Sequence, residues 1–202
     1  MSHILLITSS PRTDSYSTRV ARSLAEKLAA GDPTSTLVAR NLTHEPLPHI
    51  DDAFAKARNL TADSLTPAET AVLASSDMLV RELFAADIII MAAAMINLSI
   101  PSNLKAYIDY VVRPGVTFQY TEHGPEGLVK GKKAYVVVAR GGIYSQGPAQ
   151  ALNFQDPYLR AALGLIGITD VEVIPVEGVA FGPEAADQAV STALAQVAAI
   201  GR

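Results

Sequence analysis

The chain has 202 residues, of which 49% are hydrophobic, and it carries a net charge of −4. These values predict a globular chain with one full-sized domain over residues 1–202 and exclude a disordered one. The acidic balance argues against nucleic-acid binding, and the absence of cysteine excludes disulfides, thiol catalysis and cysteine metal sites. No apolar run reaches the ~20 residues of a membrane helix, and no secretion signal precedes the first strand. We therefore expect a cytoplasmic protein that binds neither membranes nor a metal ion.

Five apolar runs predict strands, which in chain order cover residues 3–8, 36–40, 87–94, 134–139 and 171–176. Five helical patterns alternate with them and cover residues 17–30, 66–86, 101–112, 158–166 and 183–200. Two long excursions interrupt this alternation, namely residues 41–65, with one helical turn near residues 53–58, and the glycine-rich residues 116–133. Loops of this length are uncommon and are often functional.

A serine-rich loop joins the first strand to the first helix. The leading N–H groups of a helix have no acceptor inside the helix, and the helix dipole favours negative charge there. A phosphate at this point accepts those N–H groups, and the hydroxyls of Ser15 and Ser17 add donors. The plainer interpretation is that one of these two serines caps the helix. The loop by itself leaves both interpretations open.

The second predicted helix has a clear start signal. Thr66 is a capping residue, Pro67 suits the first helical position, and Glu69 completes a capping box. The apolar residues that this helix should bury are Val72, Leu73, Leu79 and Leu83.

The predicted sheet is parallel. Residues 88–94 form a continuous apolar run, which is typical of a strand covered on both faces. We therefore predict an α/β fold with a flavodoxin-like, doubly wound, five-stranded sheet of order 2-1-3-4-5 and helices on both faces. Ligands of such sheets bind at the carboxyl ends of the strands, where the order reverses. Residues 9–17, 95–98 and 139–142, after strands one, three and four, should surround one crevice, whereas edge strands two and five should end without such loops.

Several stretches, taken together and in order, resemble the FMN-dependent NADH-azoreductases, also known as NAD(P)H:quinone oxidoreductases. The most specific stretch is residues 115–128, GVTFQYTEHGPEGL, followed by Gly-Lys-Lys at residues 131–133. Arg-Gly-Gly at residues 140–142 and GLIGITD at residues 164–170 match as well. The resemblance covers nearly the whole chain. It implies a flavodoxin-like fold, bound FMN and a homodimer whose sites lie at the interface.

The resemblance also implies which residues form the site. Those that would bind the flavin are Ser10, Ser15, Tyr16, Ser17, Met95, Ile96, Asn97, Leu98, Ala139, Arg140, Gly141 and Gly142. Phe118 and Tyr120 match the segment that lies over the flavin and near the substrate, although alternate aromatics also suit simple hairpin packing. No side chain is assigned as an obligatory acid or base.

The chain lacks an aromatic residue of the family pattern at three positions, and it has Ala139 where the family usually has serine. The family usually has Met-Tyr-Asn-Phe after the third strand, where this chain has Met-Ile-Asn-Leu. Leu165 stands where relatives often have an aromatic residue from the second subunit. Fewer aromatic residues near the flavin affect the expected substrate preference more than the expected binding of FMN.

The function that the resemblance implies is hydride transfer from NADH or NADPH, through bound FMN, to small-molecule quinones and azo compounds. The two substrates would use one site in turn, in a ping-pong order, which explains why the chain has no Gly-x-Gly-x-x-Gly dinucleotide motif. A flavodoxin-like electron carrier that serves protein partners is the alternative. A phosphate-binding module without flavin is a third possibility. The long excursions favour the enzyme, because a carrier needs an open flavin edge.

Overall fold

The structure is a computed structural model that describes residues 2–201. In this part of the chain, a five-stranded sheet has the order β2-β1-β3-β6-β7, and every neighbouring pair is parallel. Its strands are β1 (His3–Thr8), β2 (Thr36–Asn41), β3 (Ile88–Ala94), β6 (Lys133–Arg140) and β7 (Asp170–Glu177). Strands β4 (Phe118–Thr121) and β5 (Gly124–Gly127) form a separate hairpin. When only the strands of the five-stranded sheet are counted, β6 and β7 are its fourth and fifth strands, and the order is the predicted 2-1-3-4-5. The predicted flavodoxin-like fold class is therefore confirmed.

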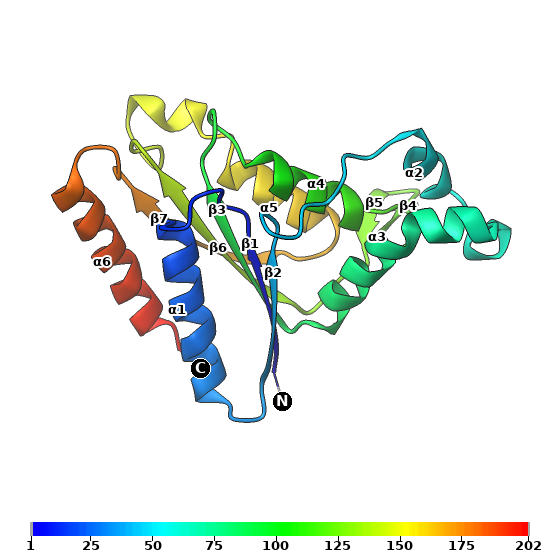
Figure 1. The fold of residues 1–202 in the computed structure, drawn as a ribbon, viewed down its shortest axis with the longest axis horizontal. Helices are drawn as coiled ribbons and strands as arrows, with labels where there is room; N and C mark the ends of the chain where they lie inside the picture. Colours follow the sequence, from blue (N-terminus) through cyan, green and yellow to red (C-terminus); the bar gives the residue numbers. More distant parts are fainter. Residues whose placement is uncertain (1, 202) are drawn as a thin grey trace.

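Helices cover both faces of the sheet (Figure 1). The helices on one face are α1 (Tyr16–Gly31) and α6 (Pro183–Ala199), and those on the other are α3 (Pro67–Ala85), α4 (Ser102–Val111) and α5 (Asp156–Leu165). Successive strand residues point to opposite faces. In β1, Leu5 and Ile7 therefore join the core under α3, α4 and α5, while Ile4 and Leu6 pack toward α1 and α6. Burial on both sides explains the uninterrupted apolar runs.

The helix start signals are confirmed. Ser15 caps α1, because its side chain accepts a hydrogen bond from the backbone N–H of Thr18. Thr66 and Glu69 form the capping box at the start of α3. Of the four apolar residues predicted to be buried in α3, Val72 is partly buried and the three leucines are buried. The polar excursion between β2 and α3 contains α2 (Asp52–Ala57), as predicted, and a short 3₁₀ helix, η1 (Ala62–Ser64).

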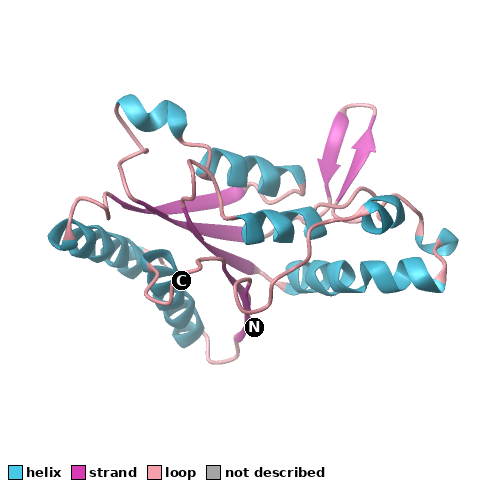
Figure 2. Cartoon of the chain, turned by 45° about the horizontal axis from the view of Figure 1, so that its top comes forward, coloured by secondary structure: helices cyan, strands magenta, loops and turns pink. Residues whose placement is uncertain are grey.

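The second excursion contains the hairpin of β4 and β5, in agreement with the hairpin packing that the alternate aromatic residues suit. Figure 2 shows these two short strands projecting away from the five-stranded sheet. The base of the hairpin packs against the turn after α5. There, a Cβ atom on Gly127 would lie 2.0 Å from the backbone nitrogen of Gly167, so this contact requires glycine.

Candidate functional site

A cleft of about 340 Å³ lies at the carboxyl ends of β1, β3 and β6, within the range of ~300–1,000 Å³ that is usual for small-molecule sites. The predicted flavin residues that line it are Ser10, Ser15, Tyr16, Met95, Ile96, Ala139 and Gly141. They come from all three predicted loops, at the upper side of the sheet in Figure 1. The loops after the first, third and fourth strands of the sheet therefore do surround one crevice.

The first loop carries unpaired donors beside this cleft, which Tyr16 lines and Ser17 does not. The backbone N–H groups of Tyr16 and Ser17, at the start of α1, have no acceptor among the described residues. The Ser15 hydroxyl lies 3.2 Å from that of Ser17, whose side chain is fully buried. Ser10 accepts a hydrogen bond from the backbone N–H of Arg12 over 3.3 Å. Free N–H groups and hydroxyls at a helix start form an arrangement that suits an anion such as a phosphate.

The second loop is a tight turn with strained backbone. Ile96 and Ser99 exchange two backbone hydrogen bonds of 2.9 and 3.1 Å, so Asn97 and Leu98 occupy the two central positions. Their φ angles are +47° and +73°, and they are the non-glycine residues with positive φ in the described part of the chain. Two central residues with positive φ define a type I′ turn. Such strain in a bulky residue is concentrated at functional sites.

The third loop is held by the segment that follows β7. The carbonyls of Arg140, Gly141 and Gly142 accept hydrogen bonds of 3.0–3.2 Å from the N–H groups of residues 178–180. The N–H groups of Gly141 and Gly142 have no acceptor among residues 2–201. They are therefore free to donate to a ligand, as the N–H groups at the start of α1 are.

The expectation that both edge strands end without a loop at the site was wrong for β7. Val179 and Ala180, after β7, line the cleft. The backbone hydrogen bonds to the third loop bring them there, and sequence reasoning had no pairing partner to assign to them. A signal was present in the glycines on either side, Gly178 and Gly182, which both have positive φ.

The Arg140 side chain does not enter the cleft. Its side chain is 2% exposed and forms ion pairs with Asp156 and Glu177 on the far side of the strand ends. Burial by itself raises the pKa of Glu177, but hydrogen bonds from Ser145, Arg140 and the Tyr144 N–H outweigh it and hold that pKa below its usual value.

Phe118 and Tyr120 lie outside the cleft of their own chain. Phe118 is 5% exposed and Tyr120 is 76% exposed, and their rings pack edge to face with centroids 5.4 Å apart. No hairpin residue is among those that line the cleft. Within one chain, therefore, the two residues are together but are not brought to the predicted flavin residues.

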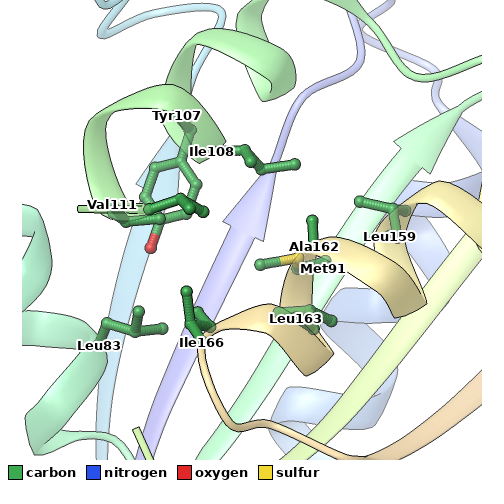
Figure 3. A pocket seen from close by; sticks show the side chains of 10 residues that line it. Leu83, Met91, Tyr107, Ile108, Val111, Leu159, Ala162, Leu163 and Ile166 are labelled. Atoms are coloured by element: carbon green, nitrogen blue, oxygen red, sulfur yellow. The ribbon is translucent and has the colours of Figure 1, made fainter. Parts of the chain in front are cut away.

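A second, smaller cavity lies between α3, α4, α5 and β3. Figure 3 shows its lining, which is Tyr107 among apolar side chains. Its volume is about 10 Å³, enough for roughly one water, but a buried water needs two to four polar partners. This cavity is therefore a packing gap in the core.

Residues 2–201 contain no cluster of three or more metal-ligating side chains. None of the helices described for this chain is both long and apolar enough to cross a membrane.

Residues 2–200 match the family model of the flavodoxin-like fold. The FMN-dependent NADH:quinone oxidoreductase 1 of Rhizobium etli is 56% identical over 98% of this chain and 97% of its own length. The corresponding protein of Agrobacterium fabrum is 50% identical over 98% and 97%. Among solved structures, an FMN-dependent NADH-azoreductase of Bacillus anthracis in complex with FMN has a TM-score of 0.85 and 26% identity, covering 98% of each chain. The chain therefore belongs to the flavodoxin-like family of FMN-dependent NADH:quinone oxidoreductases, as the order of its motifs predicted.

Proposed function

We propose that this chain binds FMN in the cleft between β1, β3 and β6 and transfers a hydride from NADH or NADPH to quinones and azo compounds. The observation that carries the proposal is the set of unpaired N–H groups on two loops around one cleft. Tyr16 and Gly141 line the cleft, and Ser17 and Gly142 follow them directly in the chain. Two pairs of fixed donors on separate loops suit a ligand with a phosphate at one end and a polar ring at the other. The names of the relatives support the same cofactor and reaction.

Each loop has a distinct part in this proposal. Ser10, Ser15 and the N–H groups of Tyr16 and Ser17 would hold the phosphate. Met95–Leu98 would lie along the ring, with the Asn97 amide toward its polar edge. Ala139 and Gly141–Gly142 would direct N–H groups at the side of the ring where negative charge grows on reduction.

We propose that the two substrates use this cleft in turn. When bound, FMN supplies the hydride chemistry, and the protein binds and orients the reactants. With FMN in this cleft of about 340 Å³, the nicotinamide nucleotide and the acceptor would use the same face of the ring in turn, which would give ping-pong kinetics. The chain would need no dinucleotide-binding motif, because the nucleotide occupies the site only briefly.

The site would be completed in a homodimer. Phe118 and Tyr120 lie outside the cleft of their own chain, so they contact substrate only if the hairpin of one subunit covers the cleft of the other. The exposed Tyr120 is available for such a contact. The groove of about 300 Å³ along α4 and α5, which Leu165 lines, is a further surface that a second subunit would cover.

The colour of the purified protein tests the proposed function directly. We expect a yellow protein that NADH bleaches anaerobically and that a quinone or an azo dye recolours with steady turnover. A flavodoxin-like electron carrier would instead be yellow and reduced poorly by NADH, and would show no turnover with small acceptors. A phosphate-binding module would be colourless. Parallel lines in a double-reciprocal plot against both substrates would support the ping-pong order.

Replacing Gly141 by valine tests the third loop. A Cβ atom at Gly141 would lie 3.3 Å from the Cβ of Ala180, so the branched side chain presses on the loop after β7 or enters the cleft. We expect FMN to bind at least tenfold more weakly, as measured by fluorescence titration. Gly164→Ala in α5, where no atom lies within 4 Å of the new Cβ, is the control. Full flavin occupancy in the valine variant would show that this loop does not contact FMN.

A further inference from the structure

A network of polar side chains joins the ends of three strands directly behind the cleft. Arg140 Nε donates to Gln155 Oε1 over 3.0 Å, Nη1 donates to Glu177 Oε1 over 2.8 Å, and Nη2 bonds Asp156. Gln155 is fully buried, and its Nε2 donates to the carbonyl of Ala93 at the end of β3 over 3.0 Å. The end of β6 is therefore tied to the end of β3 and to the start of α5 through one guanidinium.

The same network fixes the loop that follows β6. Glu177, at the end of β7, accepts hydrogen bonds from the Tyr144 N–H over 2.8 Å and from the Ser145 hydroxyl over 2.5 Å. The Gly141 and Gly142 peptides are thus held from two sides. On one side their carbonyls accept N–H groups of the segment after β7, and beyond them residues 144 and 145 are anchored on Glu177. Their unpaired N–H groups are left with a fixed direction.

Stability alone is a weak reason for this network. A buried ion pair contributes little net stability on average, because desolvation offsets the attraction between the charges. A planar guanidinium with three engaged arms does, however, fix the relative positions of its partners more closely than a lysine ammonium, which is a point charge on a flexible stem. Hydrogen-bond donors that already point to the place where negative charge develops stabilise that charge, because the protein does not have to reorganise during the reaction.

We propose that Arg140, with Gln155 and Glu177, is a positioning residue that aims the N–H groups of Gly141 and Gly142 at the flavin and thereby raises its midpoint potential. This inference rests on the proposed function and assigns Arg140 a role behind the cleft, without direct contact with the cofactor. The buried arginine and glutamine act on the flavin through the backbone of the third loop.

The sign of the potential change separates positioning from a direct field effect. Glu177→Gln removes a negative charge near a site where negative charge develops, so the field effect alone raises the midpoint potential. Loss of positioning lowers it. We expect the potential to fall, because reduced FMN is bound at least tenfold more weakly relative to oxidised FMN, which corresponds to about 30 mV for a two-electron couple. The measurement is an anaerobic redox titration of the flavin-loaded protein.

Arg140→Lys keeps the charge and removes the planar fork. We expect it to lower the potential in the same direction, whereas a field effect leaves the potential unchanged. Ser145→Ala removes one tie of the loop, leaves both charges in place and alters an exposed residue. We expect Ser145→Ala to lower the midpoint potential by a smaller amount. This variant tests the positioning role even if the Arg140 or Glu177 variant fails to fold.

Asp77→Asn is the matched control. Asp77 pairs with Arg113, which is 5% exposed, and neither residue lines the cleft. We expect this control to lower the melting temperature without moving the potential. A fall in melting temperature with unchanged potential in the Arg140 and Glu177 variants would overturn the inference, as would a rise in potential for Glu177→Gln. Failure of the unsubstituted protein to bind FMN would refute the proposed function instead.

Discussion

At the scale of single residues, two buried side-chain atoms in the described part of the chain have no hydrogen-bond partner, namely Tyr107 Oη and Arg113 Nε. Tyr107 is fully buried among apolar side chains (Figure 3). Burial is the main cause that raises the pKa of its hydroxyl far above the usual value; the Glu82 charge adds to this rise and the Arg40 charge opposes it. An unsatisfied buried hydroxyl costs about 1–3 kcal/mol relative to a paired one.

Removing that hydroxyl should therefore stabilise the fold. We expect Tyr107→Phe to raise the free energy of unfolding by about 1 kcal/mol, because the ring stays and the unpaired oxygen goes. Urea unfolding measures the change. Tyr110→Phe is the control, since its oxygen is not among the unpartnered buried atoms. A clear loss of stability in Tyr107→Phe would mean that the hydroxyl has a partner in solution.

Asn97 combines a backbone role with a proposed contact to FMN, and two substitutions separate them. Its positive φ favours glycine or asparagine, so we expect Asn97→Ala to lose about 1 kcal/mol of stability and Asn97→Gly to lose less. Both variants lack the amide and should weaken FMN binding equally. Normal FMN binding in the glycine variant, together with weaker binding in the less stable alanine variant, would show that the amide does not contact the cofactor.

At the scale of elements, the start of α3 depends on local sequence. The Thr66 side chain accepts a hydrogen bond from the Glu69 N–H, and Glu69 bonds back to the Thr66 N–H. We expect Thr66→Ala to cost about 1 kcal/mol, measured by thermal or urea unfolding. Thr61→Ala is a suitable comparison, because the Thr61 side chain bonds only the exposed Ser64 hydroxyl and caps no backbone N–H of η1. Equal losses in both variants would contradict the importance of the cap.

The link between β7 and the third loop predicts a pH dependence. The pKa of Glu177 is lower in the folded state than the usual ~4.3 of the unfolded chain. Its contribution to stability is therefore fully present above about pH 4.3 and is lost as the pH falls through the folded value. We expect the melting temperature of the unsubstituted protein to fall more steeply below pH 5 than that of Glu177→Gln. Parallel curves would show that this carboxylate is not stabilised by folding.

At the scale of the whole molecule, the separation of hairpin and cleft predicts complementation between subunits. Gly141→Val should lose flavin but keep Tyr120, whereas Tyr120→Ala should keep flavin but reduce kcat/KM for quinones. In mixed dimers, the intact hairpin of the first variant covers the loaded cleft of the second. We expect recovery of quinone reduction after the two proteins are unfolded and refolded together, compared with the same proteins refolded apart. Purely additive activity would place Tyr120 outside the site.

Local pattern determined most of the elements, and the alternation of strands and helices along the whole chain predicted the order of the sheet. Apolar runs, the capping signals at Ser15 and Thr66, and the position of the long loops depend on neighbours within a few residues, and so they could be interpreted from the sequence. Because parallel strands place all their carboxyl ends at one edge, the crevice followed from the strand order as well.

Tertiary structure decided the features that depend on partners far along the chain. The direction of the Arg140 side chain is determined by residues 15 to 37 positions away, and the place of Val179 and Ala180 by backbone bonds to the third loop. The distance of the hairpin from the cleft likewise follows from its packing on α5 and the turn after it. Such contacts leave no periodic signal in the sequence, because each one joins two segments at a single point. A residue type such as arginine can also lie on either face of the sheet at the end of a strand. The sequence thus determined where a site would form, and only the packed chain decided which side chains face it.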